Sequence, residues 1–318
     1  MSVANTPIKV IYIMAWGRSG STLLGNLLGE IDDFFHAGEL RTIWEKGLLR
    51  GRLCGCGQRV PECSFWQDVM GRGFGQIDVK AVCEAQRSAA RLRHAPRLLR
   101  GHPGNGLPGG DDTKTYASSV VSLYRALGKA TGARVIVDSS KREADAALLR
   151  LLDGIEPYYV HLVRDPRAVA YSWQRRKATP EPRGEMVTYK PSTSTRNWLG
   201  LNVTAEAIRR RVGRDRYLFV RYEDLITGPR DALESIVKMV EEWPARLPVN
   251  ENGAVKLTRN HTAGGNPGRF HTGPVPLRLD DEWVALQPRS QRLVATTIAM
   301  PLLHRYRYPW RPRLARSR

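Results

Sequence analysis

Short apolar runs alternate with longer amphipathic stretches along the 318-residue chain. Apolar runs of this length suit buried strands better than helices. The pattern predicts strands at residues 10–15, 34–35, 133–140, 158–163 and 216–225. It predicts helices that begin near Thr22 and over residues 79–95, 115–130, 142–152, 167–176, 230–243 and 280–300, the last one broken near Pro288. A chain of this length suits one large α/β domain.

The first predicted strand leads into a turn of small residues, and a helix with Leu23, Leu24, Leu27 and Leu28 on one side follows it. Free N–H groups and the helix dipole make such a turn a cradle for an anion. The turn consists of Gly17, Arg18, Ser19, Gly20, Ser21 and Thr22. It is not a Walker A loop, because Ser21 stands where that motif requires Lys. A strand-to-helix turn without a ligand is the alternative.

Charged residues follow three other predicted strands. Glu39 follows the strand at 34–35, Lys141 the strand at 133–140, and Arg164 the strand at 158–163. Because the carboxyl ends of parallel strands meet at one edge of a sheet, we expect these residues to line one crevice with Arg18. Each could instead be an ordinary residue at a helix start, and His36 is a rival to Glu39 as a general base.

Several motifs resemble those of the sulfotransferases that use 3′-phosphoadenosine 5′-phosphosulfate (PAPS). They are RSGST after the first strand, GELRTIW around Glu39, the spacing R-x7-S from Arg164 to Ser172, and YEDL in the last predicted strand. The tyrosylprotein, carbohydrate and bacterial branches are the most similar in motif. The resemblance implies an α/β, P-loop-type three-layer fold with a central parallel sheet flanked by helices.

The resemblance also implies residue roles. Glu39 would deprotonate the acceptor, while Arg18 and Lys141 would neutralise charge on the transferring group. Arg164 and Ser172 would hold the 3′-phosphate. The other donor-binding residues implied are Gly17, Ser19, Gly20, Ser21, Thr22, Tyr222, Asn266 and Arg269. The product would be adenosine 3′,5′-bisphosphate, and protein cations would replace a metal ion in the reaction.

The formal charge of +19 and the pI of about 10.3 suit anionic ligands such as nucleotides or acidic surfaces. No run is long enough to span a membrane, and the N-terminus lacks the pattern of a secretory signal, so we expect a cytoplasmic protein. The resemblance points to a small-molecule, lipid or glycan acceptor and no specific nucleic acid. Basic segments could contact a membrane peripherally. A P-loop kinase or NTPase and a basic polyanion-binding protein are the alternative functions.

We interpret residues 1–318 as one domain with two appendages: an acceptor-side insertion at 50–112 and a basic tail at 305–318. Residues 177–196, rich in Pro, Thr and Ser, are predicted to form a loop over the acceptor site. Within the insertion, Cys54, Cys56 and Cys63 lie close together, and no fourth zinc ligand is evident next to them. Recruitment of His36 or Cys83, a local disulfide and free thiols all remain open.

Overall fold

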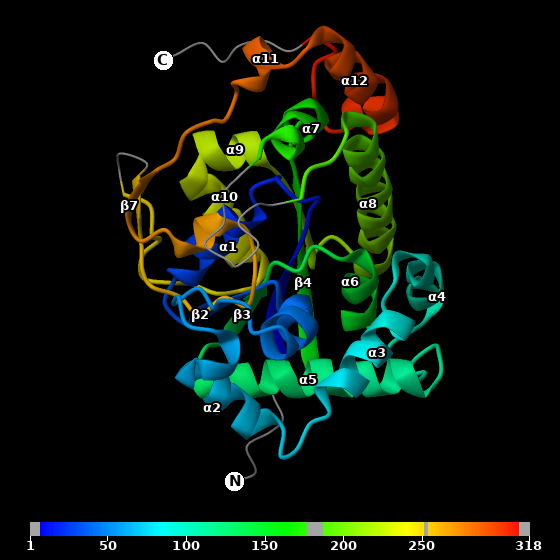
Figure 1. Cartoon of the computed structure of the whole chain (residues 1–318), viewed down its shortest axis with the longest axis vertical. Coiled ribbons are helices and arrows are strands. Elements are labelled where there is room, and N and C mark those ends of the chain that lie inside the picture. The colour runs from blue at the N-terminus through cyan, green and yellow to red at the C-terminus, as the bar shows by residue number, and fades with distance from the viewer. Residues whose placement is uncertain (1–6, 177–186, 251–253, 312–318) are drawn as a thin grey trace.

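The central sheet has five parallel strands in the order β2-β3-β1-β4-β5. The structure is a computed structural model that describes residues 7–176, 187–250 and 254–311. The strands are β1 (Ile8–Met14), β2 (Phe34–Gly38), β3 (Val135–Asp138), β4 (Ile155–Val163) and β5 (Tyr217–Arg221) (Figure 1). All five overlap the strands that the hydrophobic pattern predicts, and the predicted α/β fold with a central parallel sheet is confirmed. The strand expected at 216–225 is wrong in its second half, because β5 ends at Arg221 and residues 222–225 begin a helix.

The alternation of side chains along β1 explains why the sheet is covered on both faces. Val10, Tyr12 and Met14 are buried in one hydrophobic cluster, and Ile11 and Ile13 in another. Successive side chains of a strand point to opposite faces, so a strand that is apolar throughout must be covered on both sides.

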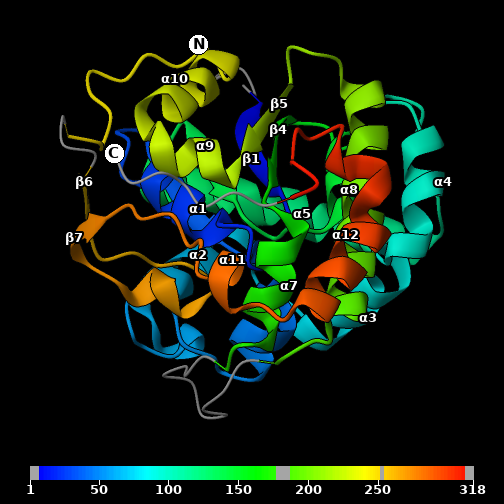
Figure 2. The same cartoon turned by 90° about the horizontal axis from the view of Figure 1, so that it is seen from above.

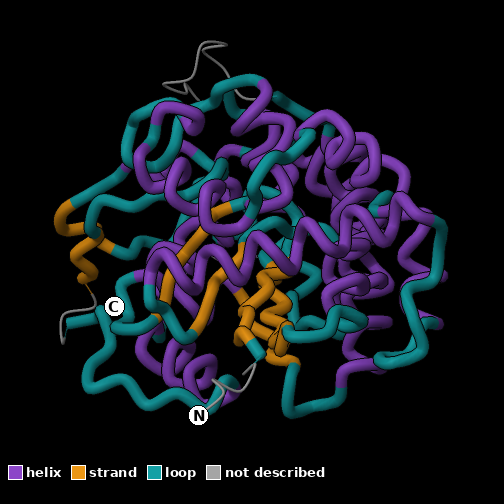
Figure 3. Tube along the Cα trace, turned by 90° about the horizontal axis from the view of Figure 1, so that it is seen from below, coloured by secondary structure: helices purple, strands orange, loops and turns teal. Residues whose placement is uncertain are grey.

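Helices form a layer on each face of the sheet. Those packed on the Ile11 face are α1 (Ser21–Gly29), α9 (Tyr222–Thr227) and α10 (Pro229–Met239). Those on the Tyr12 face include α5 (Asp111–Thr131), α6 (Glu143–Leu149) and α8 (Pro191–Val212). Figure 2 shows α9 and α10 on one side of the strands and α8 on the other, and Figure 3 shows the long α5 crossing in front of the strands.

A third cluster joins α8 to α7 (Pro166–Gln174) and α12 (Arg289–Leu303) through Val169, Trp198 and Ala299. The predicted break near Pro288 is confirmed, because α11 (Trp283–Leu286) ends before it and α12 begins after it. The predicted loop at 177–196 is partly wrong, since α8 begins at Pro191; residues 177–186 lie outside the described residues.

Residues 50–112 are more regular than their composition suggests. They contain α2 (Ser64–Gly73), α3 (Val79–Ala89) and α4 (Ala95–Arg100), and both α2 and α3 pack on α5. The single helix expected at 79–95 is wrong: α3 ends at Ala89, and Pro96 lies in the first turn of α4, where its missing N–H costs nothing. This segment shares the hydrophobic cluster on the Tyr12 face of the sheet.

The remaining elements are short. An antiparallel hairpin is formed by β6 (Ala254–Leu257) and β7 (Gly273–Pro276). Short helical segments that are not α-helices are η1 (Leu40–Thr42), η2 (Ile43–Leu49), η3 (Val60–Glu62), η4 (Leu92–His94) and η5 (Pro267–Phe270). Of the helices in the described ranges, none combines the length and the apolar character that crossing a bilayer requires.

Candidate active site

Two residues of the turn between β1 and α1, Gly20 and Arg18, have a positive φ. Gly20 precedes the helix with a φ of 92°, in the left-handed region that favours glycine. A Cβ atom on Gly20 would lie 2.5 Å from the ring of Tyr222. Arg18 also has a positive φ, of 71°. Residues held in such conformations cluster at ligand-binding sites, so the turn is shaped for something other than a simple connection.

The side chain of Arg18 is buried, and the described part of the chain offers it no hydrogen-bond acceptor. The residue is 9% exposed, and none of its three guanidinium nitrogens has a hydrogen-bond partner among the described residues. Its guanidinium lies 5.0 Å from the ring centroid of Trp173, and burial lowers its pKa. A buried cation with no acceptor is costly, and an anion with several oxygens would remove that cost.

Glu39 and Lys141 meet at the carboxyl ends of β2 and β3. The Lys141 ammonium donates to Oε1 of Glu39, and both side chains are mostly buried. Burial acts to raise the pKa of Glu39, but the attraction of Lys141 outweighs it, so the pKa lies below its usual 4.5. Lys141 has a φ of 66°, in the left-handed region that residues with a side chain rarely adopt. The pair is therefore an ionised carboxylate beside an ammonium.

Arg164, at the end of β4, is linked to the β1–α1 turn. Its Nη1 donates to the carbonyl of Arg18 (3.1 Å), and its guanidinium lies 4.5 Å from the ring centroid of Tyr222. Its Nη2 donates to the carbonyl of Asp280 (2.8 Å) and is 3.1 Å from that residue's carboxylate. The Asp280 carboxylate thus occupies the place beside Nη2 of Arg164 where an anionic ligand would bind.

The loop before η5 covers the start of α1. The backbone N–H of Asn266 donates to the Thr22 hydroxyl (3.3 Å), and the Asn266 side chain accepts from the N–H of Gly268. Arg269 is 2% exposed, and its guanidinium donates to the carbonyls of Gly265 and Leu53. Arg269 therefore holds the loop together from behind, whereas Asn266 faces the start of the helix.

These residues surround one cavity of about 910 Å³, within the range of nucleotide-sized ligand sites. Of the residues predicted for the site, the following line it: Gly17, Arg18, Gly20, Ser21, Thr22, Glu39, Lys141, Arg164, Ser172, Tyr222 and Asn266. Ser19 and Arg269 do not line it. Ser19 is 1% exposed, and its hydroxyl has no hydrogen-bond partner in the described part of the chain.

His36 does not line this cavity. Its ring is buried against α1, with Nδ1 at 3.2 Å from the Asn26 side chain and Nε2 at 3.1 Å from the Ser139 hydroxyl. Burial, together with the nearby Lys141, lowers the pKa of His36 to about 3. Both ring nitrogens of His36 thus face protein groups, whereas the carboxylate of Glu39 lines the cavity.

Sequence reasoning missed several residues of the cavity wall, among them Trp173, Lys46 and Asp280. Trp173 donates its Nε1 to the carbonyl of Gly17 (3.0 Å), so it fixes the turn as well as contacting Arg18. Lys46 adds a further cation, and Asp280 adds the carboxylate that meets Arg164. Trp173 follows Ser172 directly and could have been found from the R-x7-S motif. Nothing local marks Lys46 or Asp280.

Comparison with known proteins agrees with this architecture. The model of the sulfotransferase family matches residues 111–244, a range that contains Lys141, Arg164, Ser172 and Tyr222. No curated protein sequence matches the chain.

Solved structures extend the likeness to almost the whole chain. The sulfotransferase domain from the curacin biosynthetic pathway is 19% identical, with a TM-score of 0.52, and the match covers 96% of this chain and 99% of that one. The sulfotransferase domain from the Synechococcus PCC 7002 olefin synthase is 23% identical, with a TM-score of 0.49 and coverages of 96% and 97%. The first of these shows that the chain has a sulfotransferase fold. The family match adds that residues 111–244 are similar in sequence to sulfotransferases.

Proposed function

We propose that this protein transfers a sulfuryl group from PAPS to a hydroxyl or amine of a small-molecule, lipid or carbohydrate acceptor. The observation that carries the proposal is the buried Arg18 guanidinium, which lacks an acceptor among the described residues and lines one cavity with the Glu39–Lys141 pair. An anionic donor would satisfy Arg18, and the Glu39 carboxylate in the same cavity would be the base that the reaction needs.

The β1–α1 turn and the end of β4 would bind different parts of the donor. The backbone N–H groups from Ser19 to Thr22, at the start of α1, would hold the phosphosulfate with Arg18. The fork of Arg164 and the hydroxyl of Ser172 would hold the 3′-phosphate. Binding of that phosphate would take Nη2 of Arg164 from Asp280, while Nη1 keeps its bond to the Arg18 carbonyl.

The chemical step is a displacement at sulfur. The acceptor oxygen attacks the sulfur as Glu39 takes its proton, and the bond from sulfur to the bridging oxygen breaks with release of adenosine 3′,5′-bisphosphate. Arg18 and Lys141 would neutralise the charge that develops on the bridging and sulfuryl oxygens. As the Lys141 ammonium turns from Glu39 to those oxygens, the carboxylate loses its partner and becomes a stronger base.

Calorimetric titration tests the donor assignment. Adenosine 3′,5′-bisphosphate and ATP with Mg²⁺ are titrated into the wild type, Arg164→Ala and the control Arg216→Ala. Arg216 is an exposed residue that pairs with Glu156 on the surface. We expect metal-independent binding of the bisphosphate that is lost only in Arg164→Ala. A preference for ATP·Mg²⁺ would favour a kinase or NTPase, and binding of neither nucleotide would favour a polyanion-binding protein.

Transfer itself is tested with PAPS and a mixed panel of phenols, sugars and lipid alcohols, with products detected by mass spectrometry as a gain of one sulfuryl group. The variant Glu39→Gln should form product about 10²- to 10⁴-fold more slowly while still binding the bisphosphate. Product formation by this variant at the wild-type rate would refute the assignment of Glu39 as the base.

A further inference from the structure

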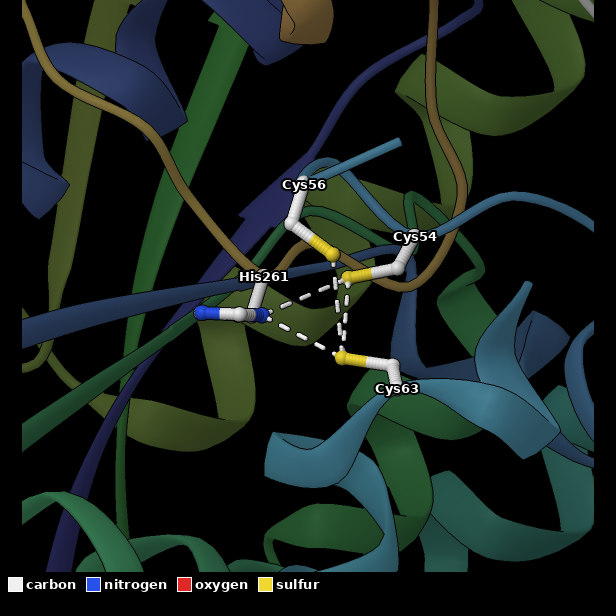
Figure 4. Close-up of side chains that lie close together, drawn as sticks. All are labelled: Cys54, Cys56, Cys63 and His261. Carbon is white, nitrogen blue, oxygen red and sulfur yellow. Dashed lines mark hydrogen bonds between the residues drawn. The ribbon is translucent and has the colours of Figure 1, made fainter. Parts of the chain in front are cut away.

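Three cysteines and a histidine from distant parts of the sequence converge beside the candidate active site. Cys54, Cys56 and Cys63 lie on the chain between η2 and α2, and His261 follows β6. Their three sulfur atoms and one ring nitrogen all lie within 4.8 Å of one another. Figure 4 shows the four side chains pointing toward a common centre.

Four of the six distances between these atoms match a tetrahedron around one zinc ion. With Zn–S of about 2.3 Å and Zn–N of about 2.0–2.1 Å, tetrahedral geometry requires about 3.8 Å between sulfurs and about 3.6 Å from sulfur to nitrogen. Cys63 Sγ lies 3.7 Å from Cys56 Sγ and 3.9 Å from Cys54 Sγ. Nδ1 of His261 lies 3.7 Å from Cys54 Sγ and 3.4 Å from Cys63 Sγ.

The backbone around Cys54 and Cys56 forms a tight turn that directs both sulfurs inward. The N–H of Cys54 donates to the carbonyl of Gln58 (2.7 Å), and the N–H of Gly57 donates back to the carbonyl of Cys54 (2.9 Å). Gly57 has a φ of 91°, which a residue with a Cβ rarely adopts. Backbone hydrogen bonds, and not a disulfide, therefore give the turn its shape.

Residues 260–262 pack so closely against this turn that Gly55 has no room for a side chain. The N–H of Gly55 donates to the carbonyl of Thr262 (3.0 Å), and a Cβ on Gly55 would lie 1.9 Å from Oδ1 of Asn260. The ring of Phe65 stacks on His261 with centroids 4.7 Å apart. Stacking fixes the plane of the imidazole, so that Nδ1 faces the sulfurs.

We propose that Cys54, Cys56, Cys63 and His261 bind a structural Zn²⁺ ion. Three thiolates and one imidazole are ligands typical of zinc, and four protein ligands leave no open position for catalysis. Binding releases the three thiol protons and involves no oxidation or reduction. A disulfide would use only two of the three cysteines, and all of them are free thiols in the structure. Neither His36 nor Cys83 is part of this cluster.

The site ties the insertion to the loop that covers the start of α1. Arg269 donates to the carbonyl of Leu53, next to Cys54, and the side chain of Asn260, next to His261, donates to the carbonyl of Arg269. The N–H of Ala263 donates to the carbonyl of Ala37 (2.8 Å), which is two residues before Glu39. The ion would thus hold the covering loop against the catalytic edge of the sheet. This consequence rests on the proposed function, whereas the metal site itself does not.

The first test is metal analysis of the untagged wild-type protein, purified without chelator. Elemental mass spectrometry should find about one zinc ion per chain. X-ray absorption spectroscopy at the zinc edge should show three sulfur ligands at about 2.3 Å and one nitrogen ligand at about 2.0–2.1 Å. Absence of zinc, iron in its place, or a disulfide among the three cysteines by peptide mapping would overturn the proposal. None of these measurements depends on the folding of a variant.

Variants then locate the site. Cys63→Ser should lose the zinc, whereas Cys83→Ser, which removes a buried thiol outside the cluster, should keep it. Zinc that persists in Cys63→Ser would overturn the ligand assignment. Where zinc is present, chelation should weaken bisphosphate binding, and added Zn²⁺ should restore it. Unchanged binding after chelation would refute the link to the covering loop but leave the metal site standing, so the two claims fail separately.

Discussion

Replacement of Arg18 by methionine should stabilise the unliganded protein while it weakens donor binding. Methionine preserves much of the side-chain volume and removes the charge. In the structure the three guanidinium nitrogens have no hydrogen-bond partner among the described residues, and Trp173 is the aromatic neighbour of the group. The buried charge of Arg18 therefore lowers the free energy of unfolding of the wild type, and Arg18→Met removes this penalty.

The size of the gain follows from these contacts. An unpartnered buried polar group costs about 1–3 kcal/mol, and more when it is charged. The contact with Trp173 returns up to about 2 kcal/mol, but methionine on the same ring would recover about 0.3–1.5 kcal/mol. We expect Arg18→Met to raise the free energy of unfolding by about 1 kcal/mol, which for a chain of this size corresponds to about 2 °C in Tm.

Ligand binding should change in the opposite direction. Hydrogen bonds from a charged donor contribute about 1.5–3 kcal/mol, so the Kd for adenosine 3′,5′-bisphosphate should rise about 10- to 150-fold. Thermal unfolding with and without the bisphosphate, together with calorimetric titration, measures both effects. The control Arg216→Met should change the free energy of unfolding by less than about 0.5 kcal/mol, as expected of an exposed residue. A variant that is less stable without ligand, yet binds the bisphosphate like the wild type, would refute the reasoning.

Four further predictions concern the cavity. Glu39→Gln should lower kcat about 10²- to 10⁴-fold without changing bisphosphate affinity, as steady-state kinetics can show. Because the pKa of Glu39 is lowered in the free enzyme, the wild-type kcat/KM should stay level through neutral pH and decline only below the usual carboxylate value of 4.5; a decline that begins near pH 7 would contradict this. Gly20→Ala should destabilise the fold by at least about 1–2 kcal/mol in chemical unfolding, since alanine disfavours the positive φ and meets the ring of Tyr222. Asp280→Asn should lower the Kd for the bisphosphate about tenfold, or about 1.4 kcal/mol, because it removes the carboxylate that competes for Arg164. Weaker binding in calorimetry would instead assign Asp280 to holding Arg164 in place.

The strands and the donor-side residues could be predicted because their signals are local. A short apolar run buries itself as a strand, and a charged residue directly after it must lie at the carboxyl edge of a parallel sheet. The same rule applies to Glu39, Lys141 and Arg164, and all three line one cavity. The spacing from Arg164 to Ser172 is likewise local, since it spans one turn and one helix.

What could not be predicted depends on contacts between distant segments. Asp280 meets Arg164 across 116 residues of sequence, and His261 meets Cys63 across 198. No periodicity or spacing encodes such pairs, which exist only after the sheet and its loops have packed. The position of Arg269 behind the loop was missed for the same reason: a buried arginine bound to carbonyls and an arginine awaiting an anion have the same sequence signature.

The bond from Arg164 to the carbonyl of Arg18 has a practical consequence for solution experiments. This bond holds the Arg164 guanidinium against the turn that carries Arg18, so two positive charges are kept close in the unliganded protein. Small doubly charged anions relieve such a concentration of charge without resembling the donor. Phosphate and sulfate buffers should therefore protect the protein against heat and compete with nucleotides, and affinities are best measured in chloride.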